Sequence, residues 1–353
     1  MSGNAALGEA AVLAGCTCYF GYPITPQNEL TEYMAKRMAE VPGGVFIQSE
    51  SEIAAINMVL GASVAGARAM TSSSSPGISL KQEGISYLAA DELPAVIADM
   101  VRGGPGMGNI SPAQSDYLQA TRGGGHGDYK TIVLAPASVQ ELADLVPVAF
   151  DLADEYRNPV IILGDGMLGQ LMEPVSFDHI KPPAEFPKDY ILNGAKGRPS
   201  RMIHSLLFDT KLEEEHNWKL YRKFQRIEQN EVRFETFMLE DAEMVVIAYG
   251  TSARIAKGAI KRLRQENLKV GLIRPITVWP FPTEIIQETA NRVENFFVFE
   301  MSTGQLIEDV KLALGGKRHI HFYGRPGGVI PTPIELYRVT SRHYYQAVRE
   351  KSQ

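Results

Sequence analysis

Short apolar runs and helical periodicity alternate regularly along residues 1–175. The apolar runs predict strands, and segments with apolar residues three or four positions apart predict helices between them. The expected strands are 18–22, 45–48, 69–72, 95–101, 131–135 and 159–163, and the expected helices are 26–41, 50–65, 75–90 and 138–155. Strands that alternate with helices predict an α/β fold, with a parallel sheet covered by helices on both faces.

The pattern changes after Met172 and returns near Ala242. Residues 173–190 are rich in proline, and the charged residues 209–235 have a helical spacing that predicts a solvated face and one buried stripe. The returning pattern predicts strands at 244–249, 270–276, 296–299 and 320–323, and helices at 250–269, 283–290 and 305–313. We therefore predict an α/β domain (1–175), a linker with a charged helix (176–241) and a second α/β domain (242–353). Residues 1–16 predict a short amphipathic helix.

Composition narrows the class of protein. With 44% apolar and 22% charged residues, the chain of 353 residues is typical of a globular protein with a large core. Its net charge of −6 and the absence of a basic block argue against nucleic-acid binding. No apolar run has the length of a membrane span, and the first residues lack the basic start of a signal peptide.

The chain contains two cysteines, Cys16 and Cys18. Two are too few for a disulfide framework or for a four-thiolate iron–sulfur site. We therefore expect a cytoplasmic protein, and any iron–sulfur cluster that it uses must lie on another chain.

The stretch YFGYPITPQNEL, residues 19–30, connects the first expected strand to the helix that follows it. We expect Thr25 to cap that helix and Pro26 to occupy its first position. The elbow would then present a hydroxyl and free N–H groups at the carboxyl end of a strand, where open α/β sheets bind ligands. From this stretch alone, a well-capped turn without a ligand explains the pattern equally well.

Several motifs in a fixed order resemble one enzyme family. They are GYPITPQNE (21–29), QSESEIAAINMVLGASVAGARAMTSSSSPGISLKQEGISYL (48–88), VRGGPG (101–106), GGGHGDY (123–129) and PASVQELADL (136–145). Together they resemble the 2-oxoacid:ferredoxin oxidoreductases, which use thiamine diphosphate. The resemblance implies a pyrimidine-binding-type domain of the thiamine diphosphate-binding fold, followed by a transketolase C-terminal-like domain. It is strongest to the α subunits of the branched-chain, 2-oxoisovalerate enzymes, and the 2-oxoglutarate enzymes come next.

The resemblance assigns the carboxylate that activates the cofactor to Glu52, nine residues before Gly61. In this family a glutamate hydrogen-bonds the pyrimidine, so that the cofactor's own amino group can remove the reactive proton. The helix dipole alone also favours an acidic residue near the start of a helix, and Glu50 and Glu52 both fit that simpler explanation. Glu52 is the preferred candidate and Glu50 the second.

Arg102 resembles the family's arginine for the substrate carboxylate, and it stands between an expected strand and a long glycine-rich stretch, residues 102–130. A guanidinium group matches the planar carboxylate of a 2-oxoacid, although a lone arginine in a loop is more often a surface residue. The resemblance also places Thr25 against the substrate. His126 is a weaker candidate for a contact with the substrate, the cofactor or a partner subunit.

The resemblance assigns Tyr22, Pro23 and Ile24 to the wall around the cofactor. Ser74 and Ser75, in TSSSSPG, either line the pyrimidine pocket or cap the helix that follows.

No metal ligand is assigned to this chain. GDGMLGQ (164–170) followed by Asn193 looks like the magnesium-binding motif of thiamine enzymes, in which carboxylate and amide oxygens bind the ion. The prolines of the intervening KPPAEFP disfavour the helix and strand that the motif requires. We therefore interpret Asp165 as a turn residue at a strand end.

The resemblance implies one subunit of an enzyme that oxidatively decarboxylates a 2-oxoacid to acyl-coenzyme A and reduces ferredoxin. Thiamine diphosphate is then shared with a β subunit. Magnesium and iron–sulfur clusters are expected on partner subunits, which include a γ chain and a ferredoxin-like δ chain. We expect a dimer of such hetero-oligomers and an inactive isolated chain. Two other hypotheses stay open, which are a self-contained thiamine enzyme that uses Asp165 and Asn193 and a non-catalytic assembly subunit.

Overall fold

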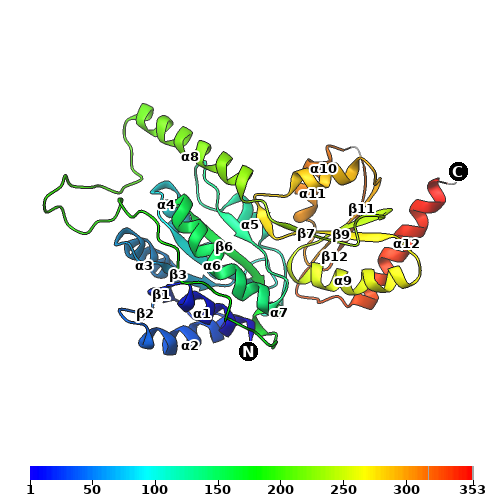
Figure 1. Ribbon diagram of the computed structural model, residues 1–353, viewed down its shortest axis with the longest axis horizontal. Helices are drawn as coiled ribbons and strands as arrows, with labels where there is room; N and C mark the ends of the chain where they lie inside the picture. Colours follow the sequence, from blue (N-terminus) through cyan, green and yellow to red (C-terminus); the bar gives the residue numbers. More distant parts are fainter. Residues whose placement is uncertain (317, 352–353) are drawn as a thin grey trace.

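The computed structural model describes residues 1–316 and 318–351. The described residues form a seven-stranded sheet and a five-stranded sheet, each surrounded by helices (Figure 1). The seven-stranded sheet lies at the left of Figure 1, and the C-terminal helix lies at the far right, beyond the second sheet. The predicted α/β class is confirmed.

The strands of the seven-stranded sheet, in spatial order, are β10 (Thr277–Trp279), β5 (Ile132–Leu134), β6 (Pro159–Asp165), β4 (Ala95–Val101), β3 (Ala69–Ser73), β1 (Cys18–Gly21) and β2 (Val45–Gln48). The five-stranded sheet consists of β12 (His319–Gly324), β11 (Asn295–Glu300), β8 (Met244–Ile247), β9 (Val270–Pro275) and β7 (Phe234–Phe237). All neighbouring strands are parallel except the pairs β10–β5 and β7–β9.

The helices are α1 (Gly3–Leu13), α2 (Asn28–Arg37), α3 (Glu52–Val64), α4 (Ser75–Ala90), α5 (Tyr117–Arg122), α6 (Val139–Tyr156), α7 (Gly166–Gln170), α8 (Thr210–Asn230), α9 (Gly250–Gln265), α10 (Thr283–Ala290), α11 (Leu306–Leu314) and α12 (Pro333–Lys351), and a 3₁₀ turn covers Met38–Glu40. Most of the predicted elements are present within a few residues of their predicted bounds.

The strand order explains how helices cover both faces of the first sheet. The connections through α2 and α6 lead to the next strand toward the β2 edge of the sheet. The connections through α3, α4 and α5 lead toward the β10 edge. Because parallel crossovers are right-handed, these two sets of helices lie on opposite faces. The packing of α1 between α2 and α6, and of α3 against α4, agrees with this division.

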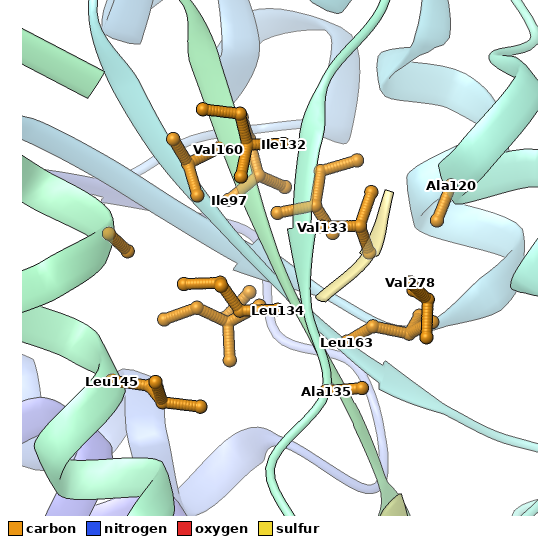
Figure 2. Packing of buried hydrophobic residues seen from close by; sticks show 14 of the residues in the cluster. Ile97, Ala120, Ile132, Val133, Leu134, Ala135, Leu145, Val160, Leu163 and Val278 are labelled. Carbon is orange, nitrogen blue, oxygen red and sulfur yellow. The ribbon is translucent and has the colours of Figure 1, made fainter. Parts of the chain in front are cut away.

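A strand from the second half of the chain completes the first sheet. The segment β10 leaves the second α/β unit and pairs antiparallel with β5. Its Val278 is fully buried and packs with residues of the first sheet, near Leu163 and Ala120 (Figure 2). Three residues are too few to show a period in the sequence, and this strand was not predicted. The two α/β units therefore share a sheet edge, and the predicted domain bounds stay a prediction.

Several predicted elements need correction. Helix α1 is buried nearly all round, not amphipathic, because it packs against α2, α6 and α7. The charged helix α8 ends at Asn230, since β7 then pairs with β9, but its buried stripe is confirmed by Leu220, Phe224 and Ile227. The glycine-rich stretch 102–130 contains α5 and so forms two shorter loops. The C-terminal α12 was not predicted.

Gln114 is one link between the two α/β units. Its side-chain oxygen accepts hydrogen bonds from the Ser252 hydroxyl at 2.6 Å and from the Met301 N–H at 3.0 Å, and its amide donates to the Tyr249 carbonyl at 3.0 Å. A buried Arg274 adds a bidentate ion pair with Glu141 of α6. The bonds of Gln114 hold the loop after β4 against the second unit, and the Arg274–Glu141 pair holds α6 against it.

Candidate active site at the carboxyl edge of the first sheet

The candidate residues follow four strands that are neighbours in the sheet. Thr25 follows β1, Glu52 follows β2, Ser74 and Ser75 follow β3, and Arg102 follows β4, in the spatial order β4-β3-β1-β2. The connection from β1 runs to one face of the sheet, and the connection from β3 runs to the other. Such a switch point opens a crevice at the carboxyl ends of the strands, where ligands bind in open α/β sheets.

The elbow is held by a buried network around Gln27. Its side-chain oxygen accepts hydrogen bonds from the hydroxyls of Ser72 at 2.5 Å and Thr31 at 3.3 Å. Ser72 also bonds Tyr19, 2.6 Å away, on β1. Helix α2 begins at Asn28, after Gln27.

The predicted capping role of Thr25 is wrong, because the turn at Pro26 and Gln27 delays the helix start. The Thr25 hydroxyl instead accepts a bond from the Asn28 amide at 3.3 Å.

Glu52 is the first residue of α3, and its side chain is buried, with 6% of the residue exposed. The preceding Ser51 caps the helix through a bond from the Ala54 N–H at 3.1 Å. Among the described residues, no hydrogen bond or ion pair reaches the Glu52 carboxylate. Glu50 is exposed and lies outside the helix. The Glu52 carboxylate is therefore available to a hydrogen-bond donor.

Arg102 lies at the end of β4 and is 7% exposed. Its terminal nitrogens donate to the carbonyls of Thr25 at 2.9 Å and Met107 at 3.0 Å, and its buried Nε has no partner. Within the described parts of the chain its guanidinium forms no ion pair. The positive charge is therefore uncompensated and fixed beside the elbow, as binding of a carboxylate requires.

The turn between β3 and α4 contacts both Glu52 and Arg102. The Ser75 hydroxyl accepts a hydrogen bond from the Arg102 N–H at 3.1 Å, and Gly77 packs so closely on Glu52 that a Cβ there would lie 2.7 Å from Oε1. The Ser74 hydroxyl precedes α4 but makes no capping bond, and the buried hydroxyls of Ser73 and Ser74 have no partner in the described structure. An unpaired acid beside unpaired hydroxyls fits the polar edge of an aminopyrimidine ring.

A cleft of about 440 Å³ opens beside this turn. Ser75, residues 104–106 and Asp116 line it on the side of the first sheet, and Ser302 and Gly327 line it on the side of the second unit. A small molecule in this cleft would therefore touch both α/β units.

Asp99 and Asp116 form a buried pair that the sequence analysis missed. Both oxygens of Asp99 and one of Asp116 lack a hydrogen-bond donor among the described residues. Burial, and then the charge of Asp116, raise the pKa of Asp99 well above its usual range, and burial also raises the pKa of Asp116. The aspartate within the apolar run AVIADMV, residues 95–101, was the sequence feature that could have indicated a buried acid.

We expect Asp99→Asn to remove a pH dependence of stability. A carboxyl with a raised folded-state pKa stabilises the fold fully below its unfolded pKa, near 4, and this stabilisation is lost as the pH rises. The variant should therefore melt at a higher temperature than the wild type at pH 8, with a difference that shrinks toward pH 4. Thermal unfolding between pH 4 and 8 measures this, with the exposed Asp128→Asn as control. An equal offset at every pH would contradict it.

The remaining candidates are exposed or half-buried. Tyr22 and Pro23 are exposed and Ile24 is half-buried. His126 is exposed, in a loop that packs on the middle of α4 through a bond from the Gly124 N–H to the Gln82 side chain at 2.8 Å. No hydrogen bond between described residues joins His126 to Thr25, Glu52 or Arg102.

Asp165 and Asn193 do not meet. Asp165 ends β6 and caps α7 by accepting bonds from the N–H groups of Met167 and Leu168, both at 3.0 Å. Asn193 lies in the exposed linker and accepts a bond from Arg198 at 2.9 Å. Over residues 1–316 and 318–351, no three His, Cys, Asp or Glu side chains are placed to hold a metal ion.

None of the helices described in residues 1–316 and 318–351 combines the length and the apolar character needed to cross a membrane.

Comparison with known families tests the resemblance. Residues 9–236 match the family described as "Pyruvate flavodoxin/ferredoxin oxidoreductase, thiamine diP-bdg", and residues 242–336 match "Pyruvate:ferredoxin oxidoreductase core domain II". The chain belongs to the pyruvate flavodoxin/ferredoxin oxidoreductase family. The predicted thiamine diphosphate-binding fold is thereby confirmed.

Relatives within this oxidoreductase family cover nearly the whole chain. Ketoisovalerate oxidoreductase subunit VorB of Methanothermobacter marburgensis is 51% identical over 93% of this chain and 93% of the relative. The VorB subunit of Methanothermobacter thermautotrophicus is 49% identical over 97% of this chain and 96% of the relative. The 2-oxoglutarate synthase subunit KorA of Methanocaldococcus jannaschii is 36% identical over 96% and 98% of the two chains.

Solved structures show the same fold. The 2-oxoglutarate:ferredoxin oxidoreductase from Magnetococcus marinus, with 2-oxoglutarate, coenzyme A and succinyl-CoA bound, matches with a TM-score of 0.82 and 27% identity. The match covers 98% of the chain described here and 65% of the Magnetococcus marinus chain. A split-gene transketolase, an inactive tetramer, has a TM-score of 0.61 at 16% identity over 97% of both chains, which supports the fold alone.

Proposed function

We propose that this chain is the α subunit of a thiamine diphosphate-dependent 2-oxoacid:ferredoxin oxidoreductase that acts on a branched-chain 2-oxoacid, 3-methyl-2-oxobutanoate. The observation that carries the proposal is the buried, unpaired carboxylate of Glu52 at the switch point of a sheet whose family binds this cofactor. The 51% and 49% identity to ketoisovalerate oxidoreductase subunits, against 36% to a 2-oxoglutarate synthase subunit, favours the branched-chain substrate.

Each residue of the site has a separate role in this proposal. When bound, thiamine diphosphate would supply the nucleophilic carbon needed for addition to the ketone of the 2-oxoacid. Glu52 accepts a hydrogen bond from the pyrimidine, while the elbow around Ile24 and the hydroxyls of Ser74 and Ser75 line the ring. Arg102 binds the substrate carboxylate, and the Thr25 hydroxyl bonds the substrate beside it. Fixing the substrate in this way lowers the entropy cost of the reaction.

The partners follow from the same proposal. A β subunit completes the cofactor site and supplies magnesium, and γ and ferredoxin-like δ subunits carry electrons through iron–sulfur clusters to ferredoxin. Coenzyme A accepts the acyl group. Both cysteines of this chain are free thiols, so we place the complex in a reducing cytoplasm.

Co-expression with the proposed β, γ and δ subunits tests the proposal. We expect the assembled complex to reduce a low-potential viologen with 2-oxoisovalerate, dependent on coenzyme A and thiamine diphosphate, and to be slower with 2-oxoglutarate. The isolated chain should be inactive. A complex that prefers 2-oxoglutarate would replace the substrate assignment, and turnover by the isolated chain would contradict the division of the site between subunits.

A further inference from the structure

Lys81 is a fully buried lysine that the proposed chemistry does not use. It lies in the second turn of α4, and its Nζ makes one hydrogen bond within the described residues, to the Glu52 backbone carbonyl at 3.4 Å. Burying a cation without an ion pair is costly, and a fold keeps such a group only where other interactions compensate. Burial lowers the pKa of Lys81 to about 8, while Glu52 acts in the opposite direction.

The position of Lys81 relative to Glu52 follows from the packing of α3 on α4. Gly77 is where the Glu52 carboxylate touches α4, and Lys81 comes four residues later, on the same face of the helix. A buried cation and a buried carboxylate therefore share one surface without forming an ion pair within the described structure.

Charged groups on the neighbouring elements interact elsewhere. Glu83, on the same helix, accepts a hydrogen bond from Tyr87 at 2.8 Å on the exposed side. Asp99 of β4 and Asp116 before α5 act on each other, on the side of Ser75 and Arg102. From α3, Glu52 is the charged group that acts on Lys81. The charge of Lys81 is therefore coupled to the acid that we assign to the cofactor.

We propose that Lys81 is a positioning residue for thiamine diphosphate, whose ammonium group attracts the Glu52 carboxylate and which takes up a proton when the cofactor binds. The inference rests on the proposed function of this site. A bound ring would exclude water from the Glu52 carboxylate, and the attraction between Glu52 and Lys81 would become stronger. Lys81 is already fully buried, so binding adds little to its own desolvation.

By thermodynamic linkage, if cofactor binding favours protonated Lys81, protonated Lys81 must favour cofactor binding. Calorimetric titration of the assembled apo-complex with thiamine diphosphate and Mg²⁺, in two buffers of different ionisation enthalpy, measures the protons taken up. The pKa of Lys81 is about 8, so at pH 8 binding can add up to half a proton to this side chain. We therefore expect the wild type to take up about half a proton more than Lys81→Met at that pH. Affinity should fall as the pH rises through 8 in the wild type and be about tenfold weaker in Lys81→Met below that pH.

Lys223 provides a matched control. It is also buried, with a pKa lowered to about 8 by burial, but it lies on α8 beside Glu92, 3.6 Å away. Lys223→Met should keep the proton uptake and the affinity of the wild type. Lys81→Arg keeps the positive charge at every pH, and it should retain affinity while losing the uptake.

The outcomes separate the two proposals. Equal proton uptake in the wild type, Lys81→Met and Lys81→Arg would show that Lys81 does not take up the proton. If Lys81→Met fails to assemble, the comparison of the wild type with Lys81→Arg decides the same question. A complex that neither binds thiamine diphosphate nor oxidises a 2-oxoacid would overturn the proposed function itself.

Discussion

Glu52→Gln should lower kcat of the assembled complex by about 10² to 10⁴-fold, the usual contribution of a positioned acid–base group. The glutamine amide has the shape of the carboxylate but carries no charge and cannot exchange a proton. It therefore cannot activate the pyrimidine as the acid does. The substitution breaks no hydrogen bond or ion pair within the described residues, so its effect on stability should be small beside its effect on kcat. The measurement is coenzyme A-dependent viologen reduction, with thermal unfolding of the same preparation.

Glu50→Gln is the matched control for this experiment. Glu50 lies two residues earlier but is exposed, and its variant should keep activity within a few-fold of the wild type. Full activity of Glu52→Gln would remove this residue from the cofactor site and would favour a non-catalytic assembly role for the chain. A large loss in both variants would indicate that the start of α3 matters as a whole.

Arg102→Ala should lower kcat/KM for the 2-oxoacid by about 10- to 150-fold, which corresponds to the 1.5–3 kcal/mol of a charge-assisted hydrogen bond. The guanidinium has no ion-pair partner among the described residues, so its charge is free for the substrate carboxylate. Steady-state kinetics with 2-oxoisovalerate measure the loss. An increase in KM at nearly constant kcat would show that Arg102 contributes to substrate binding in the ground state.

Two further variants separate binding from structure. Arg102 also holds the carbonyls of Thr25 and Met107, so Arg102→Lys should restore part of the charge but not both bonds. Arg122→Ala removes a guanidinium that pairs with Asp309 on α11, and it should leave KM unchanged. If Arg102→Ala lowers stability but leaves kcat/KM unchanged, Arg102 supports the loop and does not bind substrate.

Much of the fold was predictable because the relevant signals are local. Strand β4 and helix α4 have their predicted bounds, since an apolar run and a helical spacing reflect the faces that each element buries. The order of strands and helices, with right-handed crossovers, then brings the residues after β1 to β4 to one edge of the sheet. The residues that the resemblance assigned to one site, Thr25, Glu52 and Arg102, therefore lie at the same edge of the sheet.

Other features depend on residues that are distant in the sequence. The strand β10 is too short to have a period, and its place beside β5 depends on a sheet edge more than 140 residues earlier in the chain. Nothing near Thr25 in the sequence shows that α2 starts at Asn28, because the network of Gln27 with Ser72 of β3 sets that start.

By itself, the sequence determined the α/β class, the family resemblance and the residue types at the strand ends, because local periodicity and short motifs carry that information. The tertiary structure alone decided that Glu52 is buried and unpaired while Glu50 is exposed. It also decided that Lys81 and Asp99 are buried beside the site. Burial and charge coupling arise from side chains brought together by packing, and no local pattern in a chain records them.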